Sequence, residues 1–203
     1  MLDKRIALTG GIATGKTTVA NRFRELGAII LDADEYSRQA VEPGTPSHTA
    51  LRDRIRPSFF NPDGTLRRRE LRRGIIREPA LRNTINAILH PYIIGAMGAE
   101  RERQKKLNPR AVIVFDIPLL FEGGFDKDFN IIILAYSTPE VQVQRLIQRD
   151  KLSPSEAVRT LSMQFPIDSK RAHSDYIIEN SGEIERTLRQ VDEVWDTILK
   201  TLS

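Results

Sequence analysis

Short apolar runs of strand length recur along the chain. Residues 28–31, 111–115 and 131–135 are continuously apolar, which is typical of parallel strands that are covered on both faces. Residues 4–9 and 176–178 predict two further strands. The order strand, glycine turn, helix, strand opens the sequence, as it does in parallel α/β sheets. The pattern therefore predicts an α/β fold with a five-stranded parallel core sheet.

Amphipathic helices are expected at residues 16–26, from 139 to about 149, and at 183–202. Gly27 is a plausible stop for the first of them. The closing helix carries an apolar stripe that includes the only tryptophan, and we interpret this stripe as core contact rather than a ligand site. The stripe comprises Ile184, Leu188, Val191, Trp195, Ile198 and Leu202.

The region between the second and third strands has a different pattern. Residues 35–108 are mostly helical in periodicity, are interrupted by proline and glycine at 42–46 and 61–64, and contain no continuous apolar strand. Pro91 is expected to begin a helix there. The sequence thus predicts one domain, residues 1–203, with a helical insertion at about 35–108.

The composition restricts the class of protein and the cellular location that we expect. The 203 residues are 40% apolar and 29% charged, an ordinary globular mixture, and no apolar run approaches the roughly 20 residues of a membrane-spanning helix. The absence of cysteine excludes disulfides and thiolate chemistry. Residues 1–5 lack the apolar stretch of a signal peptide, so we expect a cytoplasmic protein with no membrane partner. The net charge of +4 does not by itself select a nucleic acid or a small anionic ligand.

The first glycine turn carries the strongest chemical signal. Residues 10–17 read Gly-Gly-Ile-Ala-Thr-Gly-Lys-Thr, which fits the phosphate-loop pattern between a strand and a helix. Backbone N–H groups and the helix N-terminus would surround phosphate oxygens, Lys16 would reach the β- and γ-phosphates, and the Thr17 hydroxyl would bind Mg²⁺. The residues expected to bind ATP are Gly10, Gly11, Ile12, Ala13, Thr14, Gly15, Lys16, Thr17 and Thr18.

Carboxylates follow two of the predicted strands. Asp32 and Asp34 are expected to end the second strand, where ligands gather in open α/β sheets. Asp34 is a candidate catalytic base for a substrate hydroxyl, and the alternative for both residues is a turn or helix cap. Asp116 ends the third run, where it either supports Mg²⁺ or serves as a turn residue.

A lid is predicted at about 138–168. Arg145 and Arg149 lie four residues apart and share one helix face, and a capping box at Ser153 and Glu156 starts the next helix. The two arginines either stabilise charge on the transferring phosphoryl group, as catalytic residues, or form a solvated basic face.

Motifs along nearly the whole chain resemble the dephospho-CoA kinase family. They are Leu8-Thr9-Gly10-Gly11-Ile12, Asp32-Ala33-Asp34, Val41-Glu42-Pro43-Gly44, Asp63-Gly64-Thr65-Leu66 with Arg68, His90-Pro91, Pro118-Leu119-Leu120-Phe121-Glu122, Gln144-Arg145-Leu146 with Arg149-Asp150, and Asp175-Tyr176-Ile177-Ile178 with Asn180 and Gly182.

The resemblance implies transfer of the ATP γ-phosphoryl group to the ribose 3′-hydroxyl of dephospho-CoA, giving coenzyme A and ADP. It implies a P-loop NTPase fold, a three-layer αβα sandwich with a helical CoA-binding insertion and a lid. It places Asp34 at the accepting hydroxyl and Asn180 near the adenine. It also puts Arg68, His90 and Leu119 in substrate-binding motifs, although His90 is equally consistent with helix-end packing. Ala13 departs from the glycine that is usual in this family, which affects only the fine geometry of the loop.

Other functions fit the sequence less well. Shikimate- and gluconate-type kinases share the phosphate loop, but shikimate kinases have a glycine-rich segment where this chain has residues 116–120. A GTP switch would show an Asn-Lys-x-Asp segment, which the sequence lacks. The arginine cluster at 67–77 is a solvated face or a contact for the CoA phosphates, and it has no aromatic platform for nucleic acid. We therefore expect ATP, Mg²⁺ and dephospho-CoA as ligands, no nucleic-acid partner, and a monomer or weak homo-oligomer.

Overall fold

The structure, a computed structural model, describes residues 4–202. Residues 1–3 and 203 lie outside this range, so the expectation for the N-terminal segment falls partly outside the described residues. The described chain divides into two compact units. We call residues 4–32 with 108–202 the sheet unit and residues 33–107 the helical unit, and each is described by itself.

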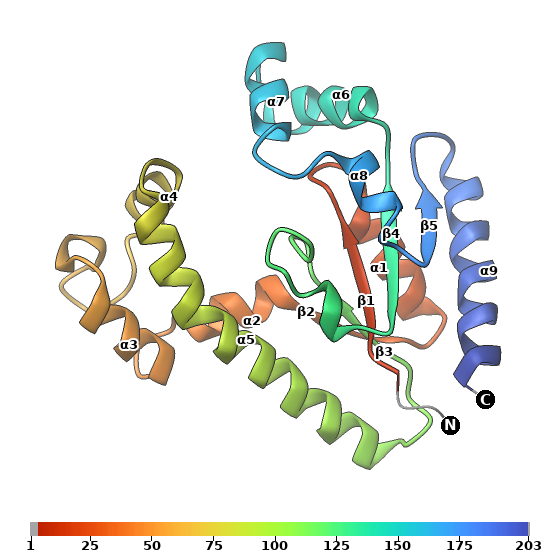
Figure 1. Ribbon diagram of the computed structural model, residues 1–203, viewed down its shortest axis with the longest axis horizontal. Helices are drawn as coiled ribbons and strands as arrows, with labels where there is room; N and C mark the ends of the chain where they lie inside the picture. Colours follow the sequence, from red (N-terminus) through yellow and green to blue (C-terminus); the bar gives the residue numbers. More distant parts are fainter. Residues whose placement is uncertain (1–3, 203) are drawn as a thin grey trace. The chain divides into compact units, whose positions relative to one another are not determined.

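The sheet unit is built on five parallel strands in the order β2-β3-β1-β4-β5 (Figure 1). In register, Ile6 of β1 lies between Val114 of β3 and Ile131 of β4. This confirms the all-parallel sheet that the apolar runs predicted. The strands are β1 (Ile6–Gly10), β2 (Ile29–Asp32), β3 (Ile113–Asp116), β4 (Ile131–Tyr136) and β5 (Tyr176–Glu179).

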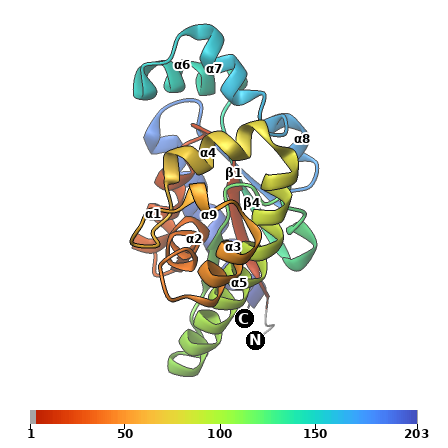
Figure 2. The same ribbon diagram turned by 90° about the vertical axis from the view of Figure 1, so that its left-hand side faces the viewer.

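Helices cover both faces of this sheet. In β4, Ile133 and Ala135 belong to the core beneath α1 and α9, whereas Leu134 and Tyr136 pack with Ile167 of α8. Alternate residues of a strand point to opposite faces, so α8 lies on the side opposite to α1 and α9 (Figure 2). The helices of this unit are α1 (Lys16–Glu25), α6 (Pro139–Asp150), α7 (Pro154–Leu161), α8 (Ile167–Arg171) and α9 (Ile184–Leu202), with a 3₁₀ turn at Asp126–Asp128.

Local signals explain the helix ends. Gly27 follows α1 with a φ angle of +102°, a conformation that glycine adopts without steric cost. The capping box at the start of α7 is present, with Ser153 and Glu156 bonded reciprocally.

In α9 the residues Val191 and Trp195 are buried as predicted, but Ile184 is 44% exposed. The prediction that Ile184 is core is wrong, because it is the first residue of α9 and lines a pocket described below.

The helical unit has its own apolar core. Its helices are α2 (Ala33–Ala40), α3 (Pro46–Arg54), α4 (Arg68–Arg77) and α5 (Pro79–Leu107), with a 3₁₀ turn at Pro57–Phe59. The core residues, all buried, are Leu51, Ile55, Phe59, Leu66, Leu71 and Ile85. This cluster is what holds α3 and α4 against the long helix α5.

Two sequence predictions for this unit are wrong. Pro91 does not begin a helix but lies inside α5, whose buried residues Ile85 and Met97 lie on either side of it. Packing of α5 therefore outweighs the backbone hydrogen bond that proline cannot make. Asp34 is not part of β2, which ends at Asp32, but lies in the first turn of α2, where a carboxylate is favoured by the helix dipole.

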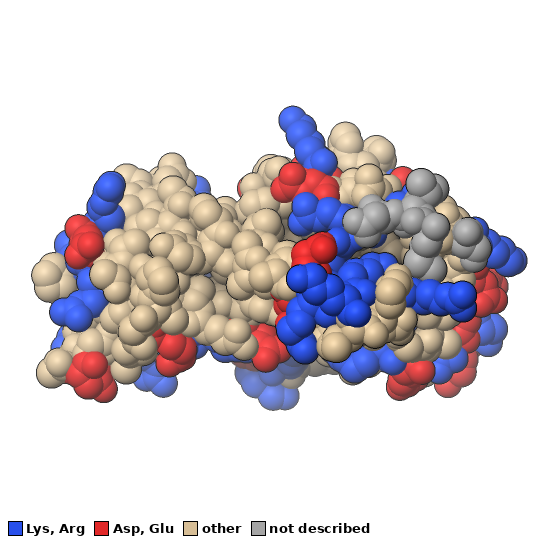
Figure 3. Space-filling view, turned by 90° about the horizontal axis from the view of Figure 1, so that it is seen from below, with Lys and Arg blue, Asp and Glu red and all other residues tan. Residues whose placement is uncertain are grey.

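The surface carries both signs of charge. On the face drawn in Figure 3, acidic side chains lie beside groups of lysine and arginine side chains. Within residues 4–202, no helix combines the length and the apolar character that crossing a membrane requires.

Candidate active site

The segment between β1 and α1 is a tight loop whose backbone requires special residues. Gly15 has a φ angle of +81° and Ala13 a φ angle of +59°, both in the left-handed region. A Cβ atom on Gly15 would lie 2.0 Å from the Nδ2 atom of Asn180, and one on Gly10 would lie 2.6 Å from the Thr14 hydroxyl. Only glycine fits at position 15, for both conformational and steric reasons.

Four consecutive carbonyl groups of this loop, those of residues 11–14, accept hydrogen bonds from side chains. The donors are Thr14 Oγ1 to Gly11 (2.9 Å), Gln142 Nε2 to Ile12 (2.5 Å), Arg145 Nη1 to Ala13 (3.2 Å) and Asn180 Nδ2 to Thr14 (2.7 Å).

These donors determine where the N–H groups of the loop point. In a trans peptide the C=O and the following N–H point in opposite directions. The N–H groups of Ala13 and Gly15 are therefore directed away from the side chains that hold the carbonyls of Ile12 and Thr14. Together with the first N–H groups of α1, which have no partner within the helix, they form a concave site for an anion.

A buried ion pair lies at the base of the loop. Lys16 Nζ contacts the Oδ1 atom of Asp116, and both side chains are largely buried. Asp116 and Asp32 are register partners at the carboxyl ends of β3 and β2. The structure thus brings the loop lysine together with the strand-end carboxylate that the sequence proposed for metal support.

The oxygen donors near the loop suit a hard cation. Thr17, at the start of α1, is exposed, and Asp116 supplies a carboxylate. Among residues 4–202 there is no group of three or more His, Asp or Glu side chains arranged to hold a metal. Mg²⁺ usually keeps several waters and binds through one or two protein oxygens and substrate phosphates, so this sparse donor set fits it.

Arg145 and Arg149 of α6 have different environments. The guanidinium of Arg145 donates to the Ala13 carbonyl, to Ser137 Oγ (2.9 Å) and to the Asn180 carbonyl (2.6 Å). Arg149 pairs with the neighbouring Asp150, and this hydrogen bond raises the pKa of Arg149. Arg145 is thus a structural bridge between the loop and the end of β5, while Arg149 is 60% exposed.

Asn180 serves the loop through its side-chain amide. Its Nδ2 atom donates to Thr14, and its Oδ1 atom accepts from the Thr187 hydroxyl of α9 (3.0 Å), which fixes the orientation of the amide. A pocket of about 590 Å³ opens beside it. Its lining includes Ala13, Gly15, Thr18, Arg145, Arg149 and Ile184.

The predicted acceptor residues are distributed over both units. Leu119, in the segment after β3, is 45% exposed in the sheet unit. Asp34, Arg68 and His90 belong to the helical unit. Arg68 pairs with Glu42 across 3.5 Å on the surface, and burial lowers the pKa of His90. Their approach to the phosphate loop stays a prediction.

Several residues around the loop were not predicted from the sequence. Ser137, directly after β4, donates to the carbonyls of Thr14 and Asn180, and its place at a strand end was an available signal. Gln142 and Gln164 bond to Ile12, and nothing in the local sequence marks them. Their partners are 130 and 152 residues away, a separation that local patterns do not encode.

The parallel sheet, the phosphate loop at the N-terminus of α1 and the lysine–aspartate pair define a P-loop nucleotide-binding protein of the phosphotransferase class. The dephospho-CoA kinase family model matches residues 4–186. The chain is 36% identical to a dephospho-CoA kinase of Leifsonia xyli over 190 residues, covering 94% of this chain and 96% of that one. The chain belongs to the dephospho-CoA kinase family.

Solved structures share this fold. The crystal structure of TT1252 from Thermus thermophilus superposes with a TM-score of 0.80 at 29% identity, covering 98% of both chains. A dephospho-CoA kinase from Campylobacter jejuni superposes with a TM-score of 0.72 at 22% identity, again over 98% of both chains, and shows the same fold. The sequence left shikimate- and gluconate-type kinases and a GTP switch as alternatives, and the family membership favours the dephospho-CoA kinase type over them.

Proposed function

We propose that the protein transfers the γ-phosphoryl group of ATP to the ribose 3′-hydroxyl of dephospho-CoA and releases coenzyme A and ADP. The observation that carries the proposal is the phosphate loop, in which four carbonyls are held outward and N–H groups are left for an anion. Family membership over residues 4–186 supports the identity of the acceptor.

Residues of the loop and α1 bind ATP in this proposal. The N–H groups of Ala13, Gly15 and the first residues of α1 face the phosphates, and Lys16 exchanges its contact with Asp116 for the β- and γ-phosphate oxygens. The pocket beside Gly15 and Asn180 receives the nucleoside. Arg145 and Arg149 of α6 neutralise charge that develops on the transferring group in this proposal.

Thr17 and Asp116 are the residues that hold Mg²⁺ in this proposal, directly or through water. The ion would neutralise charge on the β- and γ-phosphates. Release of Asp116 from Lys16 when ATP enters would free its carboxylate oxygen for this task. Removal of divalent cations with EDTA is expected to abolish turnover, and restoration by Mg²⁺ checks the assignment.

Asp34 accepts the proton of the substrate hydroxyl in this proposal. The ribose oxygen forms a bond to the γ-phosphorus, the bond between this phosphorus and the β–γ bridging oxygen breaks, and the hydroxyl proton passes to Asp34. Arg68, His90 and Leu119 contribute to binding of dephospho-CoA, with Arg68 suited to its phosphates.

The decisive experiment measures ADP release with ATP and Mg²⁺ in the presence of dephospho-CoA, shikimate, gluconate or no acceptor. Release only with dephospho-CoA, and a product heavier by one phosphate on its ribose, is the expected result. Release with another acceptor would retain the P-loop kinase and reject this substrate. ATP binding without release for any acceptor would reject the kinase function altogether.

We also propose that the protein works in the cytoplasm, as a monomer or a weak homo-oligomer, without nucleic-acid or membrane partners. On the face in Figure 3 acidic side chains lie beside the groups of lysine and arginine, and the arginine cluster at 67–77 has no aromatic platform, which supports the absence of a nucleic-acid partner. Light scattering at several protein concentrations tests the oligomeric state, and a stable mass above that of a single chain across the whole range would contradict it.

A further inference from the structure

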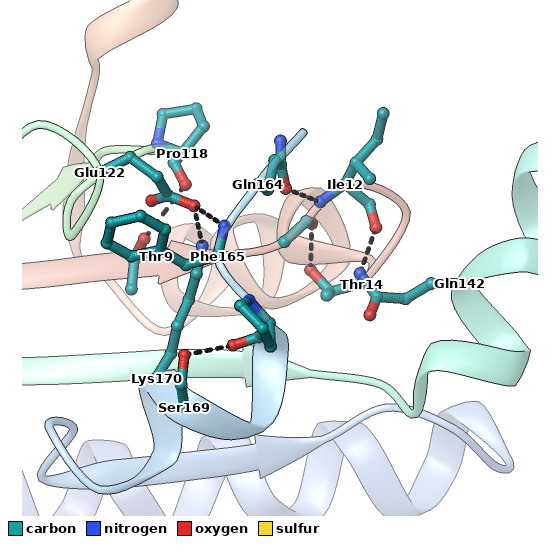
Figure 4. A network of polar contacts seen from close by, with 12 residues as sticks. Thr9, Ile12, Thr14, Pro118, Glu122, Gln142, Gln164, Phe165, Ser169 and Lys170 are labelled. Carbon is teal, nitrogen blue, oxygen red and sulfur yellow. Dashed lines mark hydrogen bonds and ion pairs between the residues drawn. The ribbon is translucent and has the colours of Figure 1, made fainter. Parts of the chain in front are cut away.

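Two glutamines from the lid region hold the same residue of the phosphate loop. The Ile12 N–H donates to Gln164 Oε1 (2.8 Å), and Gln142 Nε2 donates to the Ile12 carbonyl (2.5 Å) (Figure 4). Gln142 lies in the first turn of α6, and Gln164 lies between α7 and α8. The peptide groups on both sides of Ile12 are therefore oriented by segments far away in the sequence.

The segment that carries Gln164 is itself anchored by a buried ion pair. One oxygen of Glu122, Oε1, accepts both the Phe165 N–H (3.0 Å) and the Lys170 ammonium (2.7 Å) (Figure 4). The Lys170 side chain is 1% exposed and that of Glu122 is 15% exposed. Burying such a pair costs desolvation free energy, so its contribution to stability alone is a weak reason for its presence, and it fixes the residue next to Gln164 in place.

The contact with Gln164 affects the part of the loop that meets phosphate. While the Ile12 N–H donates to Gln164, it points away from the anion site, and the next N–H, that of Ala13, is aimed into it. Ala13 holds a left-handed conformation with φ of +59°, which a non-glycine residue keeps only when its neighbours are fixed. Loss of the acceptor at Gln164 would leave the peptide between Gly11 and Ile12 held through its carbonyl by Thr14 alone, which loosens its orientation.

We propose that Gln164 is a positioning residue for the phosphate loop, and that the pair of Glu122 and Lys170 acts through it. Gln164 transmits the placement of the lid segment to Ile12, so that the loop has its anion-binding shape only while this segment is docked. The inference rests on the proposed function, because it assumes that the loop binds the phosphates of ATP.

The test substitutes Gln164→Met, which keeps the size of the side chain and removes the acceptor, with Gln144→Met as the control on the exposed side of α6. Isothermal titration with Mg·ATP and steady-state kinetics are measured for both. Gln164→Met is expected to weaken ATP affinity and to lower kcat/KM for ATP by about tenfold to a hundredfold, because a loop N–H loses its partner. The KM for dephospho-CoA should change by less than about threefold and Tm by only a few degrees. The control should match the wild type.

A second variant, Gln164→Glu, retains an oxygen that accepts the Ile12 N–H, and it should recover at least about threefold in ATP affinity over Gln164→Met. Equal ATP affinity of the two variants, or a loss of ATP affinity that is also present in Gln144→Met, would overturn the proposal. A loss of ATP affinity that is fully explained by a lower Tm would overturn it as well.

The role of the ion pair is tested by a double-mutant cycle between Glu122→Gln and Gln164→Met. If the ion pair acts through Gln164, Glu122→Gln should change kcat/KM for ATP little in a protein that already carries Gln164→Met. Additive effects of the two substitutions would reject a role of the ion pair that acts through Gln164. If the wild type binds ATP but does not phosphorylate dephospho-CoA, the proposed function fails, whereas the role of Gln164 is still decided by the ATP affinities.

Discussion

Arg145 offers the sharpest test of how α6 and the phosphate loop depend on each other. Its guanidinium makes three hydrogen bonds, to the carbonyls of Ala13 and Asn180 and to Ser137 Oγ. Hydrogen bonds from a charged donor contribute about 1.5–3 kcal/mol each, and bonds that share one side chain are not additive. Because Arg145 is only partly buried, we expect Arg145→Ala to cost about 3 kcal/mol of folding free energy.

That loss has a measurable size in heat denaturation. For a chain of this length 1 kcal/mol corresponds to roughly 2–4 °C, so Arg145→Ala should lower Tm by about 6–12 °C. Turnover should fall by about 10²–10³, because a positive charge near the transferring group and the tether of Ala13 are lost together. The KM for dephospho-CoA should change much less. Calorimetry and the ADP-release assay measure the two effects.

Arg145→Lys separates the two contributions. Lysine keeps the charge but has no planar fork, so it reaches at most part of the three acceptors. If the tether matters, Arg145→Lys should lose much of the stability and much of the turnover despite its charge. Arg189→Ala, at an exposed position on α9, is the control. An Arg145→Ala variant with normal Tm and near-normal turnover would refute the reasoning, and a selective loss of dephospho-CoA binding would move Arg145 to the acceptor site.

Four further outcomes are expected. Lys16→Met should lower turnover by at least about 10²–10³ in a folded protein, and near-normal ADP release would remove Lys16 from the phosphoryl path. Asp34→Asn should lower turnover by roughly 10²–10⁴ while ATP binding measured by titration survives; a collapse of ATP affinity would make Asp34 a metal or structural residue. Gly15→Ala should weaken ATP binding and lower Tm, because the added Cβ meets the Asn180 amide and the left-handed backbone is strained for alanine; an unchanged Tm in calorimetry would contradict the proposed clash. Burial lowers the pKa of His90, so as the pH falls the unfolded state binds a proton on His90 before the folded state does. The free energy of unfolding in urea should therefore decrease as the pH decreases from about 6.5 through the lowered folded pKa. His90→Asn should flatten this pH dependence, and a pH profile that is unchanged in the variant would refute the assignment.

The sheet was predictable because its signal is local. Continuous apolar runs such as 131–135 have one explanation in a chain of this composition, namely burial on both faces. The boundary at Asp34 was missed because Ala33 and Asp34 suit either a strand end or a first helical turn. Pro91 was misplaced because the packing that keeps α5 intact around it is a tertiary effect.

The candidate site was predictable only in part. The phosphate loop has a fixed order of residues, each with a task, so its position follows from the sequence. Its ion pair with Asp116 was not predicted and becomes clear only from the sheet order, which places β3 beside β1. The side chains that shape the loop carry no such signature. Gln142 and Gln164 are ordinary polar residues in their own segments, and their role arises only when the chain folds back onto Ile12.

The tether between Thr14 and Asn180 has a consequence for how the chain is made. Its two residues are separated by 166 positions, and the amide of Asn180 is oriented by Thr187 still further along. A ribosome therefore synthesises the phosphate loop almost first, yet the loop acquires its last tether only after β5 and the beginning of α9 have emerged. A nascent or truncated chain that ends before β5 carries the entire motif without the Asn180 tether, so we expect it to bind nucleotide more weakly than a chain that includes β5 and the beginning of α9.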